Sequence, residues 1–325
     1  MCTMILRHTL CVIMIFGTKN RGAFFMKLNA VCVQCMIDGH VNNVSKLTNV
    51  DEDTKAMYMR DVMQTILDFP PESPSPVFAP AFDDLKRKYF GVEPFDYTET
   101  NLKYDKMIMD LYDQIRDEIE KSDDPVLTAI KYSMAANYID FSSVDVKDDE
   151  LMTMLNNASE APLDDSEYFE HMKEDLAKAK KLLFICDNGG EVVLDKLLVE
   201  QISKVYPGLH IDIMVKGKPA VNDATLVDAE YVKLSEVANV IDSGIGIAGN
   251  PLNLIKQEAL DAVKNADVII SKGQANFETM YGSGYNIYYV FLVKCNLFQH
   301  LFGLKKFSAV IENELRIADL TAAKE

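Results

Sequence analysis

The sequence predicts an α/β protein in which an α-helical bundle domain precedes a three-layer α/β/α domain with a mostly parallel sheet. The chain has 325 residues, 48% of them hydrophobic and 26% charged, and is long enough for two globular domains. After about residue 170, apolar runs of strand length alternate with helical patterns, whereas helical periods predominate before that point. Strands that alternate with helices form βαβ units, which build parallel sheets with helices on both faces.

Residues 1–25 are predicted to be an extension outside the fold. Their apolar stretch, residues 10–16, is too short to span a bilayer, and no small-residue cleavage site of a signal peptide follows it. We expect the folded protein to start at Met26. We therefore expect a helical domain at residues 26–170 and an α/β domain at residues 171–325.

The helical domain is predicted from apolar residues at helical spacing with charged residues between them. Two such patterns follow one another, on either side of Pro125. Their apolar members are Leu102, Met107, Met109, Leu111, Ile115 and Ile119, then Val126, Ile130 and Met134. Prolines recur within residues 69–80, so this stretch is expected to be a connector.

Six strands are expected in the α/β domain. The first is an apolar run that stops at an Asp-Asn-Gly-Gly turn, after which a helical pattern begins at once. The six runs occupy residues 182–186, 210–215, 237–241, 267–271, 287–293 and a final stretch near 308–311. Helical patterns separate several of the runs, so the sheet is expected to be largely parallel.

Charge and cysteine content limit the classes of partner and compartment. A net charge of −17 argues against a general binder of nucleic acid or of anionic membranes, because such a protein needs a basic face. The six cysteines are too sparse for a disulfide framework, which favours a reducing, cytoplasmic compartment. Cys32 and Cys35 form a CxxC motif, which alone does not separate a metal or redox site from two thiols on one helix.

Polar residues follow the ends of five predicted strands. The carboxyl ends of parallel strands lie at one edge of a sheet, where ligands bind, so these residues are expected to line one crevice. They are Asp187 and Asn188; Lys216, Asn222 and Asp223; Asp242, Ser243 and Gly244; Ser271, Lys272 and Asn276; and Lys294 and Cys295.

Three oxygen donors in this set indicate a divalent cation. Asp187, Asn188 and Asp223 offer the hard oxygen ligands that suit Mg²⁺ or Mn²⁺ better than zinc. Each also has a structural interpretation, because Asp-Asn-Gly is a common turn and Asn222-Asp223 suits a helix N-cap. The convergence of several such residues on one sheet edge favours the ligand site.

Phosphate oxygens are the second expected ligand. Lys272, Asn276 and Lys294 suit them, and so do backbone amides at the helix starts expected after Gly244 and Gly273. Ser243 and Gly244 are also expected to bind phosphate. The lysines alone are also compatible with a solvated surface. A metal beside a phosphate site fits phosphoryl hydrolysis, with either a metal-activated water or an Asp187 carboxylate as nucleophile.

One glycine motif is typical of dinucleotide-binding proteins, which would be a different class of protein. Gly244, Gly246 and Gly249 spell the GxGxxG of dinucleotide-binding proteins after a predicted strand. That motif should open a helix, yet Asn250-Pro251 follows it here, and the next strand does not end in an acid. Dinucleotide binding is therefore not expected. The sequence also has no P-loop and no GxSxG motif.

Four motifs in this order resemble the signatures of the damage-control phosphatase family, long catalogued as a domain of unknown function. They are DNGGEVVLDK at 187–196, KGKPAVNDAT at 216–225, SKGQANFE at 271–278 and FLVKC at 291–295. The CxxC at 32–35 resembles that of one subgroup, and residues 136–141 resemble a weaker motif. The resemblance runs from about residue 26 to residue 313.

The resemblance implies a metal-dependent phosphatase that hydrolyses small phosphorylated metabolites, either sugar phosphates or damaged phosphometabolites. Its fold would be a helical bundle joined to an α/β/α domain. The metal would be Mn²⁺, with Co²⁺, Ni²⁺ or Mg²⁺ as alternatives. The roles that carry over are metal ligation by Asp187, Asn188 and Asp223, and phosphate binding by Lys272 and Asn276, with Lys294.

Further residues are expected to support this site. Glu191 and Asn222 would hold the ligand residues without touching the metal, and Glu191 also suits a helix N-terminus. Since CxxC and a late cysteine occur together in the resembling subgroup, Cys32, Cys35 and Cys295 are expected to form a thiol cluster.

Two other functions stay open at this point. One is an S-adenosylmethionine-dependent carboxyl methyltransferase, which was also proposed within the family and would need no Asp-Asn-Asp site. The other is a non-catalytic module that binds a metal or a metabolite. The residues do not determine the physiological substrate, the native metal or the oligomeric state.

Overall fold

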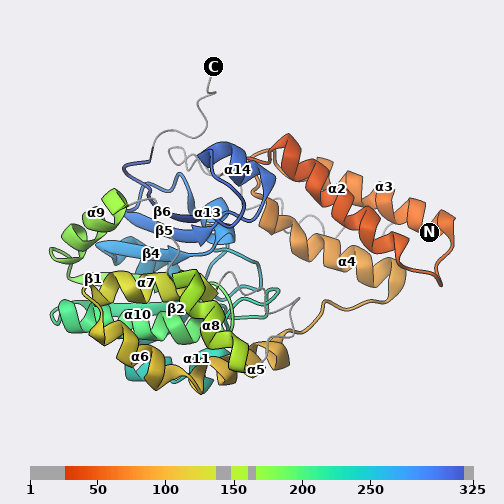
Figure 1. Cartoon of the computed structure of the whole chain (residues 1–325). Helices are drawn as coiled ribbons and strands as arrows, with labels where there is room; N and C mark the ends of the chain where they lie inside the picture. The colour runs from red at the N-terminus through yellow and green to blue at the C-terminus, as the bar shows by residue number, and fades with distance from the viewer. Residues whose placement is uncertain (1–25, 137–147, 160–165, 318–325) are drawn as a thin grey trace.

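The computed structural model describes residues 26–136, 148–159 and 166–317, and its centre is a six-stranded sheet (Figure 1). The predicted extension, residues 1–25, and most of the weaker motif at 136–141 lie outside these ranges. The strand order is β3-β2-β1-β4-β5-β6, with only β6 antiparallel to its neighbour. The strands are β1 (Lys181–Ile185), β2 (His210–Val215), β3 (Asn239–Asp242), β4 (Val268–Lys272), β5 (Ile287–Leu292) and β6 (Ala309–Asn313).

All six predicted strands are present, and the predicted fold class is confirmed. Five of them begin within one residue of the expected position. The third begins two residues later than expected, because the short 3-10 helix η3 (Leu234–Glu236) and its cap precede it. The expected parallel pairing holds for the first five strands.

The sheet is buried on both faces, as its nearly continuous apolar strands predict. In β1, Leu182 and Phe184 belong to one hydrophobic core, while Leu183 and Ile185 belong to another on the opposite face. Helices that contribute to the first core are α5 (Thr98–Met109), α6 (Tyr112–Lys121), α7 (Pro125–Ala135), α8 (Asp148–Ser159), α9 (Ser166–Leu176), α10 (Glu191–Val205) and α11 (Leu226–Tyr231). The second core is covered by α12 (Gln257–Asn265), α13 (Gln274–Met280) and α14 (Asn296–Phe302).

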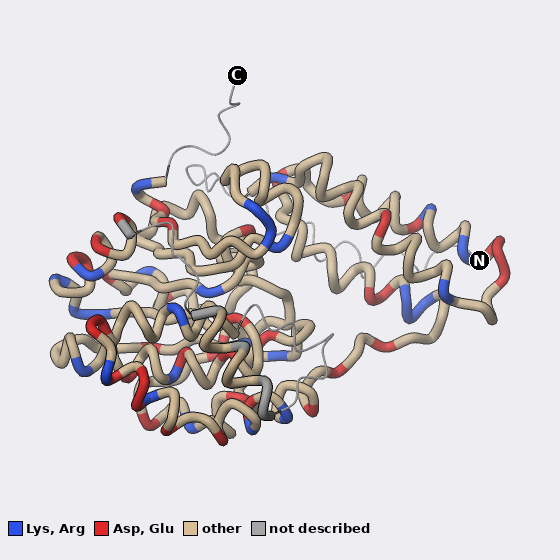
Figure 2. The backbone as a smooth tube through the Cα atoms, in the orientation of Figure 1, with Lys and Arg blue, Asp and Glu red and all other residues tan. Residues whose placement is uncertain are grey.

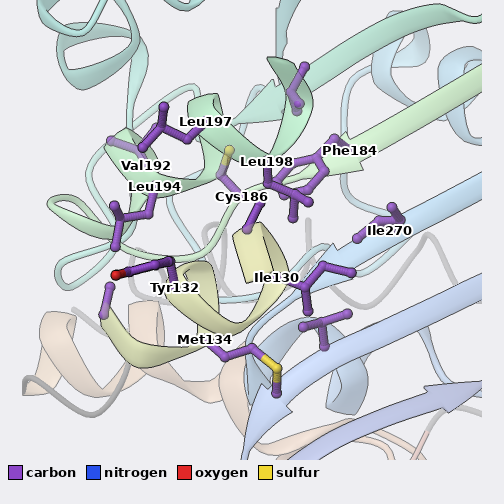
Figure 3. Close-up of a cluster of buried hydrophobic side chains, with 14 of the residues drawn as sticks. Ile130, Tyr132, Met134, Phe184, Cys186, Val192, Leu194, Leu197, Leu198 and Ile270 are labelled. Atoms are coloured by element: carbon purple, nitrogen blue, oxygen red, sulfur yellow. The ribbon is translucent and has the colours of Figure 1, made fainter. Parts of the chain in front are cut away.

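The packing of α7 on α10 fixes the helix that begins at the candidate site. Ile130 and Met134 of α7 lie in the same buried cluster as Leu194, Leu197 and Leu198 of α10 (Figure 3). Each fully buried side chain of this size contributes about 1.5–3 kcal/mol relative to an exposed one. The start of α10, directly after β1, is therefore held on a rigid element.

The first three described helices form a unit with its own small core. α2 (Ala30–Ser45), α3 (Glu52–Asp68) and α4 (Ala79–Phe90) lie beside the sheet and its covering helices in Figure 1. The 3-10 helix η1 (Ser75–Phe78) forms in the proline-rich connector. The core of this unit consists of Val44, Tyr58, Val62, Phe78 and Phe82.

The hydrophobic cores do not separate at residue 170. Residues of α5 to α9 share one core with the sheet, whereas α2 to α4 have a core of their own. The predicted domain boundaries stay a prediction, since a shared core is not by itself a definition of domains.

Acidic and basic residues are interspersed along the helices and loops (Figure 2). Within the described residues, no helix has both the length and the apolar composition that a membrane span requires.

Candidate active site

The turn between β1 and α10 carries Asp187, Asn188, Gly190 and Glu191. Asp187 is buried, with 8% of its surface exposed, and is the second residue after the end of the strand. The Nδ2 group of Asn188 donates hydrogen bonds to Asp187 Oδ2 at 2.9 Å and to Glu191 Oε2 at 3.2 Å. Gly190 has a φ of 76°, which a residue with a side chain rarely adopts, and it lets α10 begin at Glu191. One tight turn thus places two carboxylates and an amide together.

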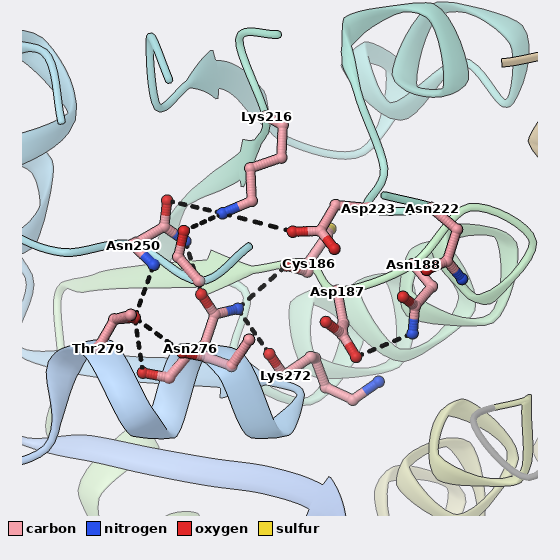
Figure 4. Close-up of polar contacts among 12 residues, drawn as sticks. Cys186, Asp187, Asn188, Lys216, Asn222, Asp223, Asn250, Lys272, Asn276 and Thr279 are labelled. Carbon is pink, nitrogen blue, oxygen red and sulfur yellow. Dashed lines mark hydrogen bonds and ion pairs between the residues drawn. The ribbon is translucent and has the colours of Figure 1, made fainter. Parts of the chain in front are cut away.

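The loop after β2 brings Asp223 to this turn. The backbone N–H of Ala224 donates to Asp187 O at 2.8 Å, and the N–H of Gly189 donates to Asn222 O at 2.9 Å. The backbones of Asn188 and Asp223 form a bridge between the same two loops. Asp223, which is distant in sequence from Asp187 and Asn188, is therefore their neighbour at the carboxyl edge of the sheet (Figure 4).

Lys216 forms an ion pair with Asp223. Its Nζ lies 3.6 Å from Asp223 Oδ2, and it also donates to Gly249 O and to Asn250 Oδ1. Burial raises the pKa of Asp223 to about 7, although the Lys216 ammonium acts in the opposite direction, and the nearby charge of Asp187 raises it further. The carboxylates of Asp187 and Asp223 repel each other in a buried site, which disfavours the ionisation of both. A bound cation would relieve this repulsion.

Gly273 explains how Asp187 fits beneath the loop after β4. Its φ is 86°, and a Cβ atom added there would lie 2.2 Å from Asp187 Cγ. The absence of a side chain therefore lets the backbone of this loop lie directly against the Asp187 carboxylate.

Lys272 lies in a buried network of charges next to the turn. Its Nζ donates to Glu191 Oε1, to Asp195 Oδ1 at 3.0 Å and to the carbonyl of Ser133 at 3.3 Å. Burial alone would lower the pKa of Lys272, but the carboxylates of Asp195 and Glu191 outweigh it and raise the pKa. The ammonium thus neutralises two carboxylates at the start of α10, and its contact with phosphate stays a prediction.

Asn276 and Asn250 connect the loops by side-chain hydrogen bonds. Asn276 Nδ2 donates to Lys272 O at 2.6 Å and to Cys186 O at 3.3 Å, while its Oδ1 accepts from Asn250 Nδ2 at 2.7 Å (Figure 4). Because Asn250 also accepts from Lys216, it joins the predicted phosphate residue to the Lys216–Asp223 pair. In the sequence, Asn250 stands out only as the residue after the glycine motif, and its role in this network was not predicted.

The other predicted phosphate residues lie around this centre. Lys294 is exposed at the end of β5, and its positive charge is close enough to lower the pKa of Asp223 slightly against the dominant effect of burial. Ser243 is fully buried, and its Oγ has no hydrogen-bond partner among the described residues. The N–H of Gly244 donates to Asp242 Oδ1 at 2.8 Å.

The glycine motif is used for close packing within the protein. A Cβ atom at Gly246 would lie 2.8 Å from Pro219 O, and one at Gly249 would lie 2.3 Å from Ala275 O. The next helix, α12, begins only at Gln257. The motif therefore does not open a helix as a dinucleotide-binding motif does.

The three cysteines of the predicted thiol cluster are free thiols near one another. Burial raises the pKa of Cys32 to about 11, and the proximity of Cys295 and Cys35 adds to the effect. The Sγ atom of Cys295 accepts a hydrogen bond from Gln274 Nε2 at 3.5 Å. The role of the cluster stays a prediction.

The predicted metal ligands fit a hard cation by their chemistry. Asp187, Asn188 and Asp223 supply carboxylate and amide oxygens at a buried position that two loops share. In the part of the chain that the structure describes, no three His, Cys, Asp or Glu side chains are grouped to hold a metal. The predicted set contains only two acids, so its third oxygen comes from an asparagine.

The fold is that of a three-layer α/β/α protein, and buried acids and lysines lie together at the carboxyl edge of its sheet. The sequence model of the damage-control phosphatase ARMT1-like domain matches residues 28–310. The chain therefore belongs to the damage-control phosphatase ARMT1-like family, and the resemblance seen in its four motifs is confirmed.

Individual relatives agree with this assignment. An uncharacterized protein of Methanocaldococcus jannaschii is 32% identical over 282 residues, which cover 83% of this chain and 90% of the relative. A damage-control phosphatase of Pyrococcus horikoshii is 30% identical over 261 residues, covering 78% of this chain and 86% of the relative. The crystal structure of a DUF89 family protein from Pyrococcus horikoshii has a TM-score of 0.71 at 27% identity, covering 89% of this chain and 99% of that one.

Proposed function

We propose that this protein is a metal-dependent phosphatase that hydrolyses small phosphorylated metabolites. The observation that carries the proposal is the meeting of Asp187 and Asn188 with Asp223 at the sheet edge, where both aspartates are buried although they come from two different loops. Membership of the damage-control phosphatase family supports the reaction, and the name of the relative from Pyrococcus horikoshii agrees with it.

The proposed roles follow from the chemistry of the side chains. Asp187, Asn188 and Asp223 would hold the metal, with Mn²⁺ as the first choice and Co²⁺, Ni²⁺ or Mg²⁺ as alternatives. When bound, the cation would draw electron density from a phosphoryl oxygen and make phosphorus easier to attack. Lys294 is an exposed cation close to Asp223, so it would bind a phosphate that approaches from solvent.

A substrate panel with defined metals tests the proposal. Sugar phosphates and nucleotide phosphates would be incubated with the protein and with Mn²⁺, Co²⁺, Ni²⁺ or Mg²⁺, and released phosphate measured. We expect hydrolysis that requires a metal and is abolished by chelation. Absence of turnover with every metal would contradict the proposal and favour a binding module.

The variant Asp187→Ala tests whether the measured hydrolysis depends on the proposed metal site. We expect at least about a 100-fold loss of metal-dependent hydrolysis, because the variant lacks one of two charged ligands. Asp261→Ala is the matched control, since Asp261 is an exposed acid on α12. Calorimetry should show that Asp187→Ala loses Mn²⁺ binding while Asp261→Ala keeps it. Full activity in Asp187→Ala would refute the assignment.

A further inference from the structure

One face of α5 is directed at both loops that carry the proposed metal ligands. Asn101 and Asp105 are one helical turn apart on this face, with 5% and 0% of their surfaces exposed. They precede the first ligand loop by more than eighty residues in the sequence, and neither lies in the four motifs described above. Two buried polar residues side by side on one helix require partners, and these partners are in the ligand loops.

Asn101 holds the second loop and touches the first. Its Nδ2 group donates to the carbonyls of Asn222 at 3.3 Å and Asp223 at 3.4 Å. A Cβ atom at Gly189 would lie 2.3 Å from Asn101 Cγ, so the first loop lies directly against this side chain. The side chain therefore sets the distance between the helix and both loops.

Asp105 holds the first loop. Its Oδ1 accepts a hydrogen bond of 2.6 Å from the backbone N–H of Gly190, two residues after Asn188. Its Oδ2 is buried and accepts no hydrogen bond from a donor of the described residues. An orphaned buried oxygen of this kind needs a proton or a donor.

Asp228 offers the matching oxygen. Its Oδ2 accepts from the N–H and the hydroxyl of Thr225, both at 2.7 Å, while its Oδ1 is buried and equally without a partner within the described segments. Burial, followed by the charge of Asp228, raises the pKa of Asp105 to about 8. Near neutral pH Asp105 therefore carries a proton, which it can donate to Asp228.

We propose that Asn101 and Asp105 are positioning residues, and that α5 fixes the separation of the two ligand loops through them. Asn101 holds the carbonyls of Asn222 and Asp223, and Asp105 connects Gly190 to Asp228 by accepting with one oxygen and donating with the other. The inference rests on the proposed function, because the loops matter for chemistry only if they hold a metal. Ligand loops from separate strands need such support, since small displacements weaken metal binding.

Two substitutions at one position test the hydrogen-bonding role of Asp105. Asp105→Asn keeps an oxygen that accepts from Gly190 and supplies an N–H group that donates to Asp228, so Mn²⁺ affinity should stay close to that of the wild type. Asp105→Ala loses both bonds and should weaken Mn²⁺ binding about 10- to 100-fold. Asp110→Ala is the control, because Asp110 is an exposed acid that follows the same helix.

Asn101→Ala gives a second measurement at another position, because it removes the bonds to Asn222 and Asp223 and the contact with Gly189 but leaves the Asp105 bonds in place. Each variant would be titrated with Mn²⁺ by calorimetry and melted without metal, and kcat and KM would be measured for a substrate of the wild type. The inference predicts weaker Mn²⁺ binding in Asn101→Ala and Asp105→Ala, with rescue in Asp105→Asn. A merely structural role would lower the melting temperature and leave Mn²⁺ affinity unchanged.

The outcomes separate the inference from the function on which it rests. A wild-type protein that binds no Mn²⁺ would overturn the proposed function. If the wild type binds Mn²⁺ and Asp187→Ala does not, the site is real. In that case, unchanged Mn²⁺ affinity in either Asn101→Ala or Asp105→Ala would overturn the role of α5. If Asp105→Ala does not fold, the Asn101→Ala titration alone decides.

Discussion

At the scale of single residues, Gly273 controls the space around the Asp187 carboxylate. Gly273→Ala should displace Asp187 and strongly reduce both Mn²⁺ binding and hydrolysis, because the added Cβ would lie 2.2 Å from Asp187 Cγ. Gly284→Ala is the matched control: its φ is 77°, but nothing lies within 4 Å of the added atom. Both variants carry the backbone strain of a positive φ, about 1–3 kcal/mol, so Mn²⁺ affinity in calorimetry, which only Gly273→Ala should change, is the measurement that distinguishes them.

The two predicted phosphate lysines should differ in their effect on stability. Lys272→Met removes the ammonium that forms ion pairs with the buried carboxylates of Glu191 and Asp195, so it should lower the free energy of unfolding by about 3–5 kcal/mol. Lys294→Met changes an exposed side chain and should alter stability by less than about 0.5 kcal/mol.

Urea unfolding and steady-state kinetics check this contrast. Lys294→Met should raise KM for the phosphorylated substrate while the protein stays folded. Equal stability of the two variants would contradict the structural role of Lys272.

Residues directly after strands could be predicted to converge, but residues inside helices could not. Asp187, Asn188 and Asp223 were found from the rule that parallel strands end at one edge of the sheet. Asp105 lies between Lys103 and Lys106, where an acid looks like part of a solvated helix surface. Its burial depends on loops far away in the sequence, and no local pattern reports such a contact.

At the scale of elements, the α2–α4 unit contains a buried histidine that should make it sensitive to acid. His40 contacts Tyr58 through a 2.6 Å hydrogen bond and packs against Phe82. Burial, followed by the charge of Lys86, lowers the pKa of His40 from 6.5 to about 4. Between these values the unfolded chain binds a proton that the folded chain does not, so stability falls as the pH is lowered from 6.5 to 4.

The expected loss over this interval is roughly 2–3 kcal/mol, at 1.36 kcal/mol for each unit of pKa shift. Urea unfolding between pH 7 and 4, followed by hydrogen exchange of α2 to α4, would measure it. His40→Gln should remove this contribution from the pH dependence, because glutamine does not titrate. His300→Gln, which changes an exposed histidine, is the control and should keep the slope of the wild type.

The positions of the strands were predictable, but the direction of β6 was not. An apolar run near residues 308–311 indicates a strand whether it pairs parallel or antiparallel. In the structure β6 pairs antiparallel to β5, with Val290 opposite Ile311. The separation of α2–α4 from the other helices was also not predictable, because helical spacing alone does not tell which core a helix joins.

At the scale of the whole molecule, the two parts should differ in local stability. The unit α2–α4 has a small core, and α3 exposes Met57 and Leu67, with 58% and 77% of their surfaces accessible. The strands β1 and β4 are buried on both faces by two large cores. Hydrogen exchange in the native state should therefore show α2–α4 opening at a lower free energy than β1 and β4. Equal protection in both parts would contradict this expectation.

The burial of β1 on both faces has a consequence for how the chain finds its native pairing. If β1 slipped by one residue, Leu183 and Ile185 would exchange faces with Leu182 and Phe184, and both faces would stay apolar. Hydrophobicity therefore discriminates weakly between the native alignment and its nearest competitor. The slip would, however, break the bond from Ala224 N–H to Asp187 O, just beyond the strand. The backbone bond between the two loops of the candidate site thus favours the native alignment of β1.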